Sequence, residues 1–421
     1  MDGSLDAIWR IESPRLVASL ARLVRDVGRA EDLAQDAFVA ALEQWPMSGV
    51  PAKPGAWLMS VARRRAIDEL RRGPMLDASH AAIAYDADAA QEAATGALDA
   101  ILDDHVGDDL LRLILTACHP VLTPDAQQAL TLRLVGGLTT SEIARAFLVP
   151  EATIGQRIVR AKRTLAEARV PFETPRGDAL RERIAAALRV IYLLFNEGYS
   201  ATAGDEWMRP SLCDDALRIG RVLATLVPDE PEIHGLVALL ELQASRQAAR
   251  VSATGEPILL LDQQRSRWDY LLIGRGLASL RRAEVLCAAR GESLGPYALQ
   301  ASIAACHARV RHAGDTDWAR VVALYDALAG IMPSPIVELN RAVAVSMAFG
   351  PAAALVLVDA LQQEPRLSSY HLLPSVRGDL LAKLGRRDEA RAELQRAASL
   401  TDNVREQRLL QARARELDHS S

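Results

Sequence analysis

The chain has 421 residues, of which 50% are hydrophobic and 24% charged, with a formal net charge of −5 at pH 7. At about 150 residues per domain, this length predicts two to four domains. Aromatic residues make up only 4%, and alternating strand-like patterns are nearly absent, so we expect an all-α fold. The net charge does not favour nucleic-acid binding, but an average over several domains hides local fields.

The cysteines and the first residues indicate the cellular compartment. Cys118, Cys213, Cys287 and Cys306 are far apart and form no CxxC motif. This spacing favours a reduced chain over a disulfide framework or a zinc site. The N-terminus lacks the apolar core of a signal peptide, and no stretch reaches the ~20 apolar residues of a membrane span. We therefore expect a cytoplasmic protein without a membrane segment.

Residues 8–75 are predicted to form one module of three helices. The expected helices span 13–28, 29–45 with a stop at Pro46, and 54–72. The third carries a dense cationic surface close to Trp57, made of Arg63, Arg64, Arg65, Arg71 and Arg72. Cations beside an aromatic ring suit a phosphate backbone with an unstacked base nearby. Taken alone, a solvated basic face with a core tryptophan is the commoner meaning of this pattern.

An acidic linker is predicted to follow at residues 76–107, which contain many Asp and Ala residues and no Lys or Arg. Its negative charge would keep it away from DNA. A second helical module begins near residue 108, with expected helices at 108–119 and 123–134. The linker therefore joins two modules that are both basic.

Residues 138–169, LTTSEIARAFLVPEATIGQRIVRAKRTLAEAR, are typical of two helices joined by a tight turn. Thr139 followed by Glu142 is a capping-box signature, and Pro150 ends one helix and permits the next to start. The predicted buried positions are Ile143, Ala144, Phe147, Ile154, Ile158 and Leu165. The predicted outward cations are Arg157, Arg160, Lys162 and Arg163. A helix-turn-helix whose second helix enters the major groove is indicated, with a solvated helical hairpin as the alternative.

In this order, the motifs resemble regions 2 and 4 of an extracytoplasmic-function sigma factor of the sigma-70 superfamily. AEDLAQDAFVAALEQWP (30–46) resembles region 2.2, which docks on the β′ clamp helices of RNA polymerase. AWLMSVARRRAIDELRR (56–72) resembles regions 2.3 and 2.4, which open and read the promoter −10 element. Residues 138–165 resemble region 4.2, which reads the −35 element. The resemblance implies core polymerase, through the β′ clamp helices and the β flap, and promoter DNA as partners.

The resemblance also implies three sets of site residues and no cofactor. The polymerase-docking positions are Asp32, Gln35, Asp36 and Phe38. The −10 positions are Trp57, Arg63, Arg64, Arg65 and Arg71. The −35 positions are Thr153, Gln156, Arg157, Arg160, Lys162 and Arg163. Leu148 stands where most such factors have Gly, and Arg64 where most have Asn, so the promoter sequence is not implied.

Residues 173–421 are predicted to form a helical C-terminal domain with repeat character. Residues 370–403 match a tetratricopeptide unit of ~34 residues, and 334–361 are interpreted as the preceding unit. Each unit has an apolar face that it cannot bury alone, so stacking is expected. With the segments 192–202, 260–269, 295–308 and 316–328, the chain resembles one group of these sigma factors that carries a tetratricopeptide-like extension.

The segment LLDQQRSRWD (260–269) places charges on both sides of Trp268, namely Asp262, Arg265, Arg267 and Asp269. We expect these side chains to form an internal ion network, which often fixes domain geometry. A contact with another module is the alternative.

The predicted domains are therefore sigma region 2 (1–75), a linker (76–107), sigma region 4 (108–172) and a tetratricopeptide-like domain (173–421). The leading interpretation is a transcription initiation factor that catalyses nothing itself. The alternative is a helix-turn-helix regulator with a tetratricopeptide sensor, acting without polymerase docking. No Walker loop, GxSxG or HExxH motif supports an enzyme. We expect the C-terminal domain to control the access of the two DNA-binding modules to polymerase. Binding of a protein partner to its surface is the other option.

Overall fold

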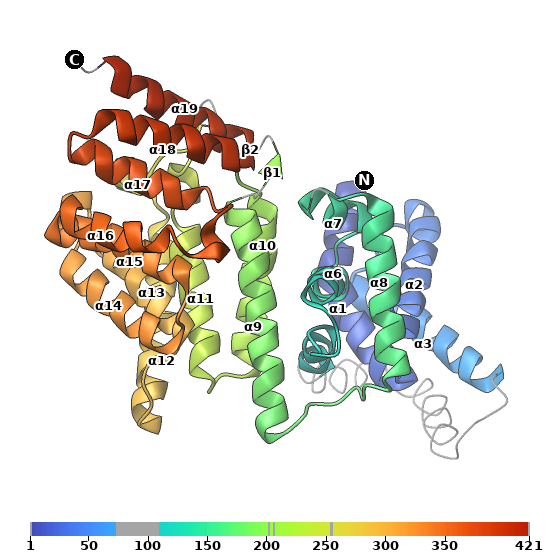
Figure 1. Cartoon of the computed structure of the whole chain (residues 1–421). Coiled ribbons are helices and arrows are strands. Elements are labelled where there is room, and N and C mark those ends of the chain that lie inside the picture. Colours follow the sequence, from blue (N-terminus) through green and yellow to red (C-terminus); the bar gives the residue numbers. More distant parts are fainter. Residues whose placement is uncertain are drawn as a thin grey trace. The chain divides into compact units, whose positions relative to one another are not determined.

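The computed structural model describes residues 2–72, 109–147, 149–200, 203–204, 207–252 and 256–419. It confirms the all-α prediction (Figure 1). The chain divides into two compact units, residues 1–190 and residues 191–421. The predicted linker at 76–107 lies outside the described residues. No described helix is both long enough and apolar enough to cross a membrane.

The first module of unit 1–190 consists of α1 (Asp2–Val24), α2 (Val27–Ser48) and α3 (Pro54–Arg72), which pack on one another. Their contact faces are rich in alanine. Ala34, Ala37, Ala41, Ala62 and Ala66 are completely buried. Side chains this small let the helix backbones approach closely.

Two predicted helix boundaries in this module were wrong. α1 continues through Pro14, and α2 continues through Pro46 to Ser48. A proline removes one backbone hydrogen bond, but burial of Leu16 and Trp45 beside the two prolines favours a continuous helix.

The turn between the first two helices also differs from the prediction, because α1 ends at Val24 and not at Gly28. Arg25 makes the turn with a positive φ of 54°. Asp26 then caps α2, its carboxylate accepting from the Arg29 backbone N–H at 2.8 Å. The capping side chain of Asp26 therefore sets the start of α2, and Gly28 lies inside that helix.

The second module contains a helix over residues 109–117, α6 (Pro124–Leu134), α7 (Thr140–Phe147) and α8 (Glu151–Glu167). The predicted capping box is confirmed. Glu142 Oε2 accepts from the Thr139 N–H at 2.8 Å, and Thr139 Oγ1 accepts from the Glu142 N–H at 3.2 Å. Pro150 directly precedes α8, as expected. All predicted buried positions are buried except Phe147, which is partly exposed.

Unit 191–421 is built from helices that pack mainly on their neighbours in the chain (Figure 1). Its first helix, α9 (Gly177–Tyr199), starts before residue 191 and is followed by β1 (Ala203–Gly204). The later elements are α10 (Pro210–Leu226), α11 (Pro231–Ala244), η1 (Gln247–Ala249), η2 (Leu260–Asp262), η3 (Arg265–Arg267), α12 (Tyr270–Arg290), α13 (Pro296–Ala308), η4 (Ala313–Asp315), α14 (Trp318–Ile331), α15 (Pro335–Phe349), α16 (Pro351–Leu361), η5 (Pro365–Leu367), α17 (Leu372–Lys383), α18 (Arg387–Leu400), β2 (Asp402–Asn403) and α19 (Val404–His419).

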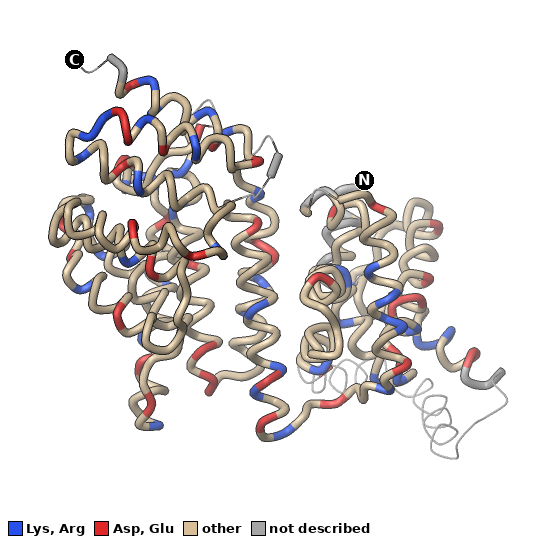
Figure 2. The backbone as a smooth tube through the Cα atoms, viewed as in Figure 1, with Lys and Arg blue, Asp and Glu red and all other residues tan. Residues whose placement is uncertain are grey.

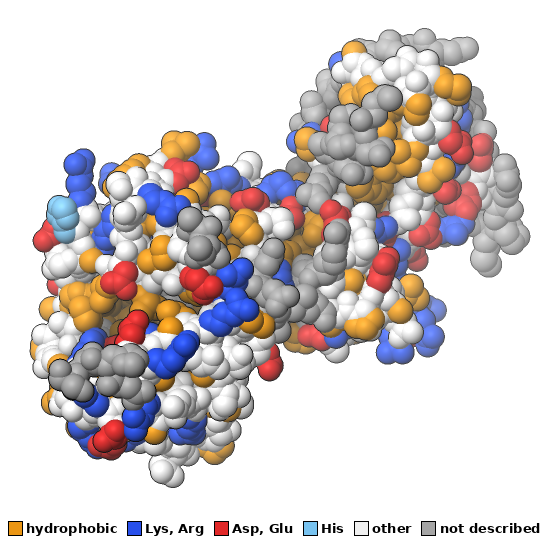
Figure 3. All heavy atoms as spheres, turned by 90° about the horizontal axis from the view of Figure 1, so that it is seen from above, with side chains coloured by type: hydrophobic (Ala, Val, Ile, Leu, Met, Phe, Trp, Pro, Cys, Tyr) orange, Lys and Arg blue, Asp and Glu red, His pale blue; other side chains and the backbone are white. Residues whose placement is uncertain are grey.

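The helical nature of the C-terminal domain is confirmed, while the tetratricopeptide label stays a prediction. The two predicted units, 334–361 and 370–403, correspond to the helix pairs α15–α16 and α17–α18. In the second pair, a Cβ atom on Gly378 would lie 3.0 Å from Leu394 Cγ, so only glycine fits without displacing the leucine. The surface of this unit in Figure 3 mixes basic, acidic and apolar side chains.

One short sheet joins segments far apart in this unit. β1 and β2 pair in parallel, with Ala203 opposite Asp402 and Gly204 opposite Asn403. Nearby, Trp207 Nε1 donates to a carboxylate oxygen of Glu406 at 3.3 Å. The end of the unit is therefore fastened to its beginning.

Candidate nucleic-acid and polymerase interfaces

The second helix of the helix-turn-helix, α8, has one buried and one exposed face. Ile154, Ile158 and Leu165 are buried against the module. Because successive residues turn by about 100°, Gln156, Arg160 and Arg163 project from the other side, and all three are exposed there. Thr153 and Arg157 lie at the edge of this face and are partly buried.

The cations of the exposed face are held weakly. Arg163 pairs with Glu167 one turn away at 2.7 Å, and both side chains are mostly in solvent. Arg157 pairs with Asp125 of α6 at 3.2 Å. Exposed pairs of this kind contribute about 0–1 kcal/mol, so a phosphate can replace the carboxylate. Arg160 makes no ion pair with a described residue, which leaves its guanidinium open to a ligand.

The predicted role of Lys162 on this face is not supported by its position. Lys162 lies about 200° around α8 from Arg160. Its Nζ atom is 2.5 Å from Glu31 Oε2 and 3.7 Å from Asp32 Oδ1, both on α2. The sequence pattern could not separate a cation that faces solvent from one that faces a neighbouring module, because both avoid the buried stripe.

The predicted −10 residues lie along α3. Trp57 is partly exposed and packs edge-to-face on Trp45, with ring centroids 5.2 Å apart. Arg64 is two turns further on, on the same side of the helix, and is exposed. The side chain of Arg71 lies outside the described part of the structure.

The flanking cations of α3 differ from Arg64. Arg63 is half-buried, and burial together with the nearby Arg22 charge lowers its pKa. Arg65 pairs with Asp36 of α2 at 3.4 Å. Three consecutive residues cannot share one helical face, so Trp57 and Arg64 form the best candidate surface for an unstacked base.

The predicted polymerase-docking residues lie on α2. Asp32 and Asp36 are exposed, whereas Gln35 donates to Glu31 at 2.6 Å. Phe38 is partly buried, with its ring 4.6 Å from that of Trp9. Figure 2 shows the acidic residues of α2 against the basic residues of α3 and α8.

Sequence reasoning missed two residues of the same surface. Val39 is 50% exposed and Leu42 is 44% exposed, next to the acidic positions of α2. Apolar residues that lie outside the buried stripe of an amphipathic helix were the available signal. The acidic and apolar side chains together form a surface suited to another protein.

A buried carboxylate joins the two modules. Glu31 of α2 is only 3% exposed and lies between two cations of the second module. Arg133 Nε and Lys162 Nζ each lie 2.5 Å from a carboxylate oxygen of Glu31. Arg133 also donates to the Leu138 carbonyl at 3.1 Å. Glu31 therefore pairs with both cations when the modules are in contact.

A second buried carboxylate belongs to the second module and pairs with a cation of the first. Asp109, at the start of the second module, is 1% exposed. It accepts from Arg22 Nε of α1 at 2.9 Å and from Arg112 at 2.6 Å. Each module thus buries one carboxylate against a cation of the other. We call these two clusters, centred on Glu31 and Asp109, the ionic clasp.

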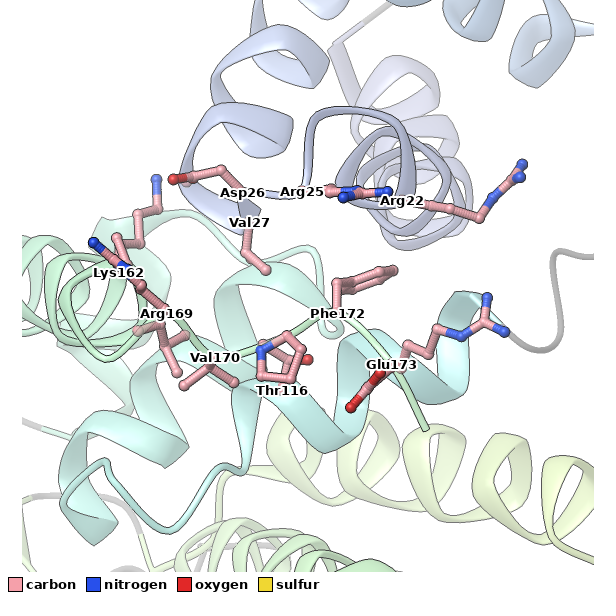
Figure 4. A pocket seen from close by; sticks show the side chains of 15 residues that line it. Arg22, Arg25, Asp26, Val27, Thr116, Lys162, Arg169, Val170, Phe172 and Glu173 are labelled. Atoms are coloured by element: carbon pink, nitrogen blue, oxygen red, sulfur yellow. The ribbon is translucent and has the colours of Figure 1, made fainter. Parts of the chain in front are cut away.

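Beside the clasp, the contact between the modules is hollow. A cavity of about 760 Å³ lies between the turn that joins α1 to α2 and the end of α8. Figure 4 shows Arg22, Arg25 and Asp26 on one side and Lys162 and Arg169 on the other. The two modules of this compact unit therefore leave an open pocket beside the clasp.

The described residues hold no metal-binding group of His, Cys, Asp and Glu side chains. Burial raises the pKa of the Cys118 and Cys213 thiols to about 12, which disfavours their reactive thiolate form.

The expected ion network of residues 260–269 does not form. No salt bridge joins Asp262, Arg265, Arg267 and Asp269 in the part of the chain that the structure describes. Arg265 instead donates to the Val310 carbonyl at 2.9 Å and lies 4.9 Å from the Trp268 ring. Asp269 caps α12, accepting from two backbone N–H groups at 2.9 and 3.0 Å. Arg265 and Asp269 therefore bind backbone groups rather than each other.

Comparisons with known proteins divide the chain in the same way. Sigma-70 region 2 matches residues 8–73, Sigma-70 region 4 matches residues 112–165, and a family of unknown function (DUF6596) matches residues 183–284. The first two matches coincide with the modules α1–α3 and 109–167. The third covers most of α9 and extends into α12.

Three relatives are similar to the chain over longer stretches than these matches. The protein named "Uncharacterized protein R00370" from Rhizobium meliloti (strain 1021) is 44% identical over 418 residues, covering 99% of this chain and 96% of the relative. The ECF RNA polymerase sigma factor SigK from Mycobacterium ulcerans (strain Agy99) is 28% identical over 158 residues, covering 36% of this chain and 78% of that protein. SigK from Mycobacterium tuberculosis (strain ATCC 25618 / H37Rv) shows the same identity and coverage.

Proposed function

The chain belongs to the extracytoplasmic-function (ECF) type of RNA polymerase sigma factors, and we propose that its two modules read separate promoter elements while the C-terminal domain controls them. Sigma factors of this family are non-enzymatic initiation factors that bring core RNA polymerase to promoter DNA. In this proposal, α2 contacts polymerase, α3 captures an opened −10 base, and α8 reads the −35 element.

The capped helix-turn-helix with the exposed face of α8 is the observation that carries this assignment. Gln156 and Arg160 are exposed side chains that can reach base edges, and Arg163 can reach a phosphate. Their helix is held at a fixed angle by the buried stripe and by the capping box at Thr139. A helix-turn-helix supported in this way suits the major groove of duplex DNA.

The ionic clasp implies a step before promoter binding. The −35 and −10 elements are separated by roughly 25 base pairs, which is about 85 Å of B-DNA at 3.4 Å per base pair. With Lys162 of α8 only 2.5 Å from Glu31 of α2, the two modules cannot reach both elements together. The closed arrangement must therefore open, and core polymerase can drive the opening by binding each module at a separate place.

Removal of the C-terminal domain tests its proposed control. Transcription from a cognate promoter is measured with core polymerase plus either the full chain or residues 1–176, after circular dichroism has confirmed that the shorter chain keeps its helices. We expect the shorter chain to start at the same site with altered activity. Equal activity and equal response to inducing conditions would dispose of the control role.

Substitution of Arg160 tests the DNA assignment. If Arg160 reads a base, Arg160→Ala in holoenzyme should lower promoter affinity by about 1–3 kcal/mol and relax preference at one position of the −35 element. If it contacts only a phosphate, the plot of the logarithm of the binding constant against the logarithm of the salt concentration should instead become less steep by about 0.9. Arg267→Ala, an exposed arginine of unit 191–421, is the control. Unchanged affinity at every promoter would remove Arg160 from the interface.

The regulator that acts without polymerase is the alternative function. It predicts that Asp32→Asn with Asp36→Asn leaves binding to core polymerase unchanged in a pull-down. The sigma factor assignment predicts weaker binding, because both carboxylates are exposed on α2.

A further inference from the structure

A cavity in unit 191–421 has the properties of a small-molecule site. Its volume is about 430 Å³, and it is lined by side chains of α9, α11, α13, α14 and α15 together with Arg246 and Leu260. Specific pockets for small organic molecules begin at roughly 300 Å³. The cavity therefore has room for a compact metabolite.

The walls of this cavity combine apolar surface with amide groups. Phe195, Tyr325 and Ile303 supply rings and an aliphatic chain, while Gln300 and Asn340 supply hydrogen-bonding groups. Among the described residues, no Asp, Glu or Lys side chain lines the cavity, and Arg246 is the one arginine that does. A ligand with an apolar body and a negative charge matches these walls.

Within the described part of the unit, Arg246 has no carboxylate partner, unlike several other arginines there. Its Nη2 atom donates to Tyr199 Oη at 2.6 Å and also to Gln243 Oε1, both neutral acceptors. Its Nε atom is buried without a hydrogen-bond partner. By contrast, Arg221 pairs with Glu241 at 2.8 Å, and Arg377 pairs with Asp359 at 2.8 Å and Glu393 at 2.9 Å.

Two further arginines add positive charge beside Arg246. Arg250 donates to the Tyr199 carbonyl, with its guanidinium carbon 3.4 Å from the centre of that tyrosine ring. Arg265 donates to the carbonyls of His307 and Val310. No salt bridge joins any of the three arginines to a carboxylate among the described residues. Arg250 and Arg265 do not line the cavity, but their charges act on Arg246, so an anion beside Arg246 is favoured by all three cations.

A buried histidine in the cavity wall is also left incomplete. His307 is only 7% exposed, and its Nδ1 atom has no hydrogen-bond partner. Its ring lies edge-on to Trp318 at 5.1 Å. His307 therefore adds a polar ring to a cavity wall that is otherwise largely apolar.

We infer that this cavity binds a small organic acid, with the carboxylate at Arg246 and an apolar or aromatic body against Phe195 and Tyr325. The carboxylate would pair with the guanidinium of Arg246, which lines the cavity. Binding requires neither polymerase nor DNA, so it can be measured even if the proposed promoter recognition fails.

Calorimetric titration of the full chain tests the inference with matched acids and amides. The probes are benzoate, 3-phenylpropionate and indole-3-acetate, each beside its uncharged primary amide. We expect at least one acid to saturate at one molecule per chain and its amide to bind about tenfold to a hundredfold more weakly, because the amide cannot form the charge-assisted bond.

Three variants distinguish the contribution of the Arg246 charge from that of the shape of the cavity. Arg246→Gln should reduce acid binding to the level of the amide. Ala304→Leu, which fills the cavity from α13, should abolish binding of both. Arg267→Gln, an exposed change outside the cavity, should alter neither. The inference is overturned if no acid saturates, if acid and amide bind equally, or if the Ala304→Leu chain binds like the unchanged protein.

Discussion

The two compact units hold their helices together by different means. In residues 1–190, the two modules meet through the buried carboxylates Glu31 and Asp109, beside a large cavity. In residues 191–421, neighbouring helices share an apolar core that runs from Leu299 on α13 to Ala390 on α18. The difference suggests that the first contact is built to separate and the second to persist.

The physical reason lies in what water does to each contact. When the modules separate, Glu31, Arg133 and Lys162 regain their hydration, which offsets most of the lost attraction. When stacked helices separate, each square ångström of exposed apolar surface costs about 25 cal/mol without compensation. The free energy of separating the charged contact between the modules can therefore be close to zero. Separating the apolar contact between stacked helices always costs free energy.

The largest effect is expected from Glu31→Gln, which leaves Arg133 without its carboxylate and Lys162 with only the more distant, exposed Asp32 in the closed arrangement. Such a loss costs about 3–5 kcal/mol, so the modules should open. Because all four native cysteines are buried, dyes can be placed selectively on cysteines introduced at Ser60 and Ala152. Energy transfer between them should fall.

Asp36→Asn is the matched control for this change. Asp36 pairs with Arg65 inside one module, and both side chains are largely exposed. Its loss should cost less than 1 kcal/mol and leave the energy transfer unchanged. Equal transfer in the Glu31→Gln chain and the unchanged protein would show that the clasp does not hold the modules.

In the stacked unit, the matching test is Leu394→Ala on α18. Leu394 is 2% exposed and packs on Gly378. The lost side chain and the resulting cavity should lower the free energy of unfolding by about 2–5 kcal/mol. Hydrogen–deuterium exchange should then accelerate in both α18 and α19, which share the apolar cluster that contains Leu394. Leu384→Ala, at a partly exposed site, should change little, and faster exchange confined to α18 would contradict a shared core.

A smaller, pH-dependent effect is expected at His307. Burial, with Arg246 and Arg265 nearby, lowers its pKa to about 4 from 6.5. Between these values the unfolded chain binds the proton and the folded chain does not, so stability falls as pH drops through this window. The loss is roughly 3 kcal/mol. His307→Asn should flatten the pH profile of unfolding between pH 6.5 and 4, and parallel profiles would contradict the assignment.

Local rules predicted the second module well. The capping box at Thr139 and Glu142, the break at Pro150 and the buried stripe of α8 each depend on a few neighbouring residues, and all appear in the structure. The boundaries at Pro14 and Pro46 failed because packing against other helices outweighed a local preference.

What the sequence could not supply was pairing over long distances. Lys162 and Arg160 look alike in sequence, yet one faces Glu31 and the other faces solvent. Glu31 itself has the pattern of an ordinary surface residue on an acidic helix. The cavity near Arg246 depends on side chains from five helices, and no motif marks it.

The pairing of β1 with β2 has a consequence for synthesis. Since Ala203 needs Asp402 as its partner, the sheet cannot form until the ribosome has released residues beyond 402. The two N-terminal modules leave the ribosome more than 200 residues earlier. A newly made chain therefore presents its DNA-reading helices for a time before its last domain is complete.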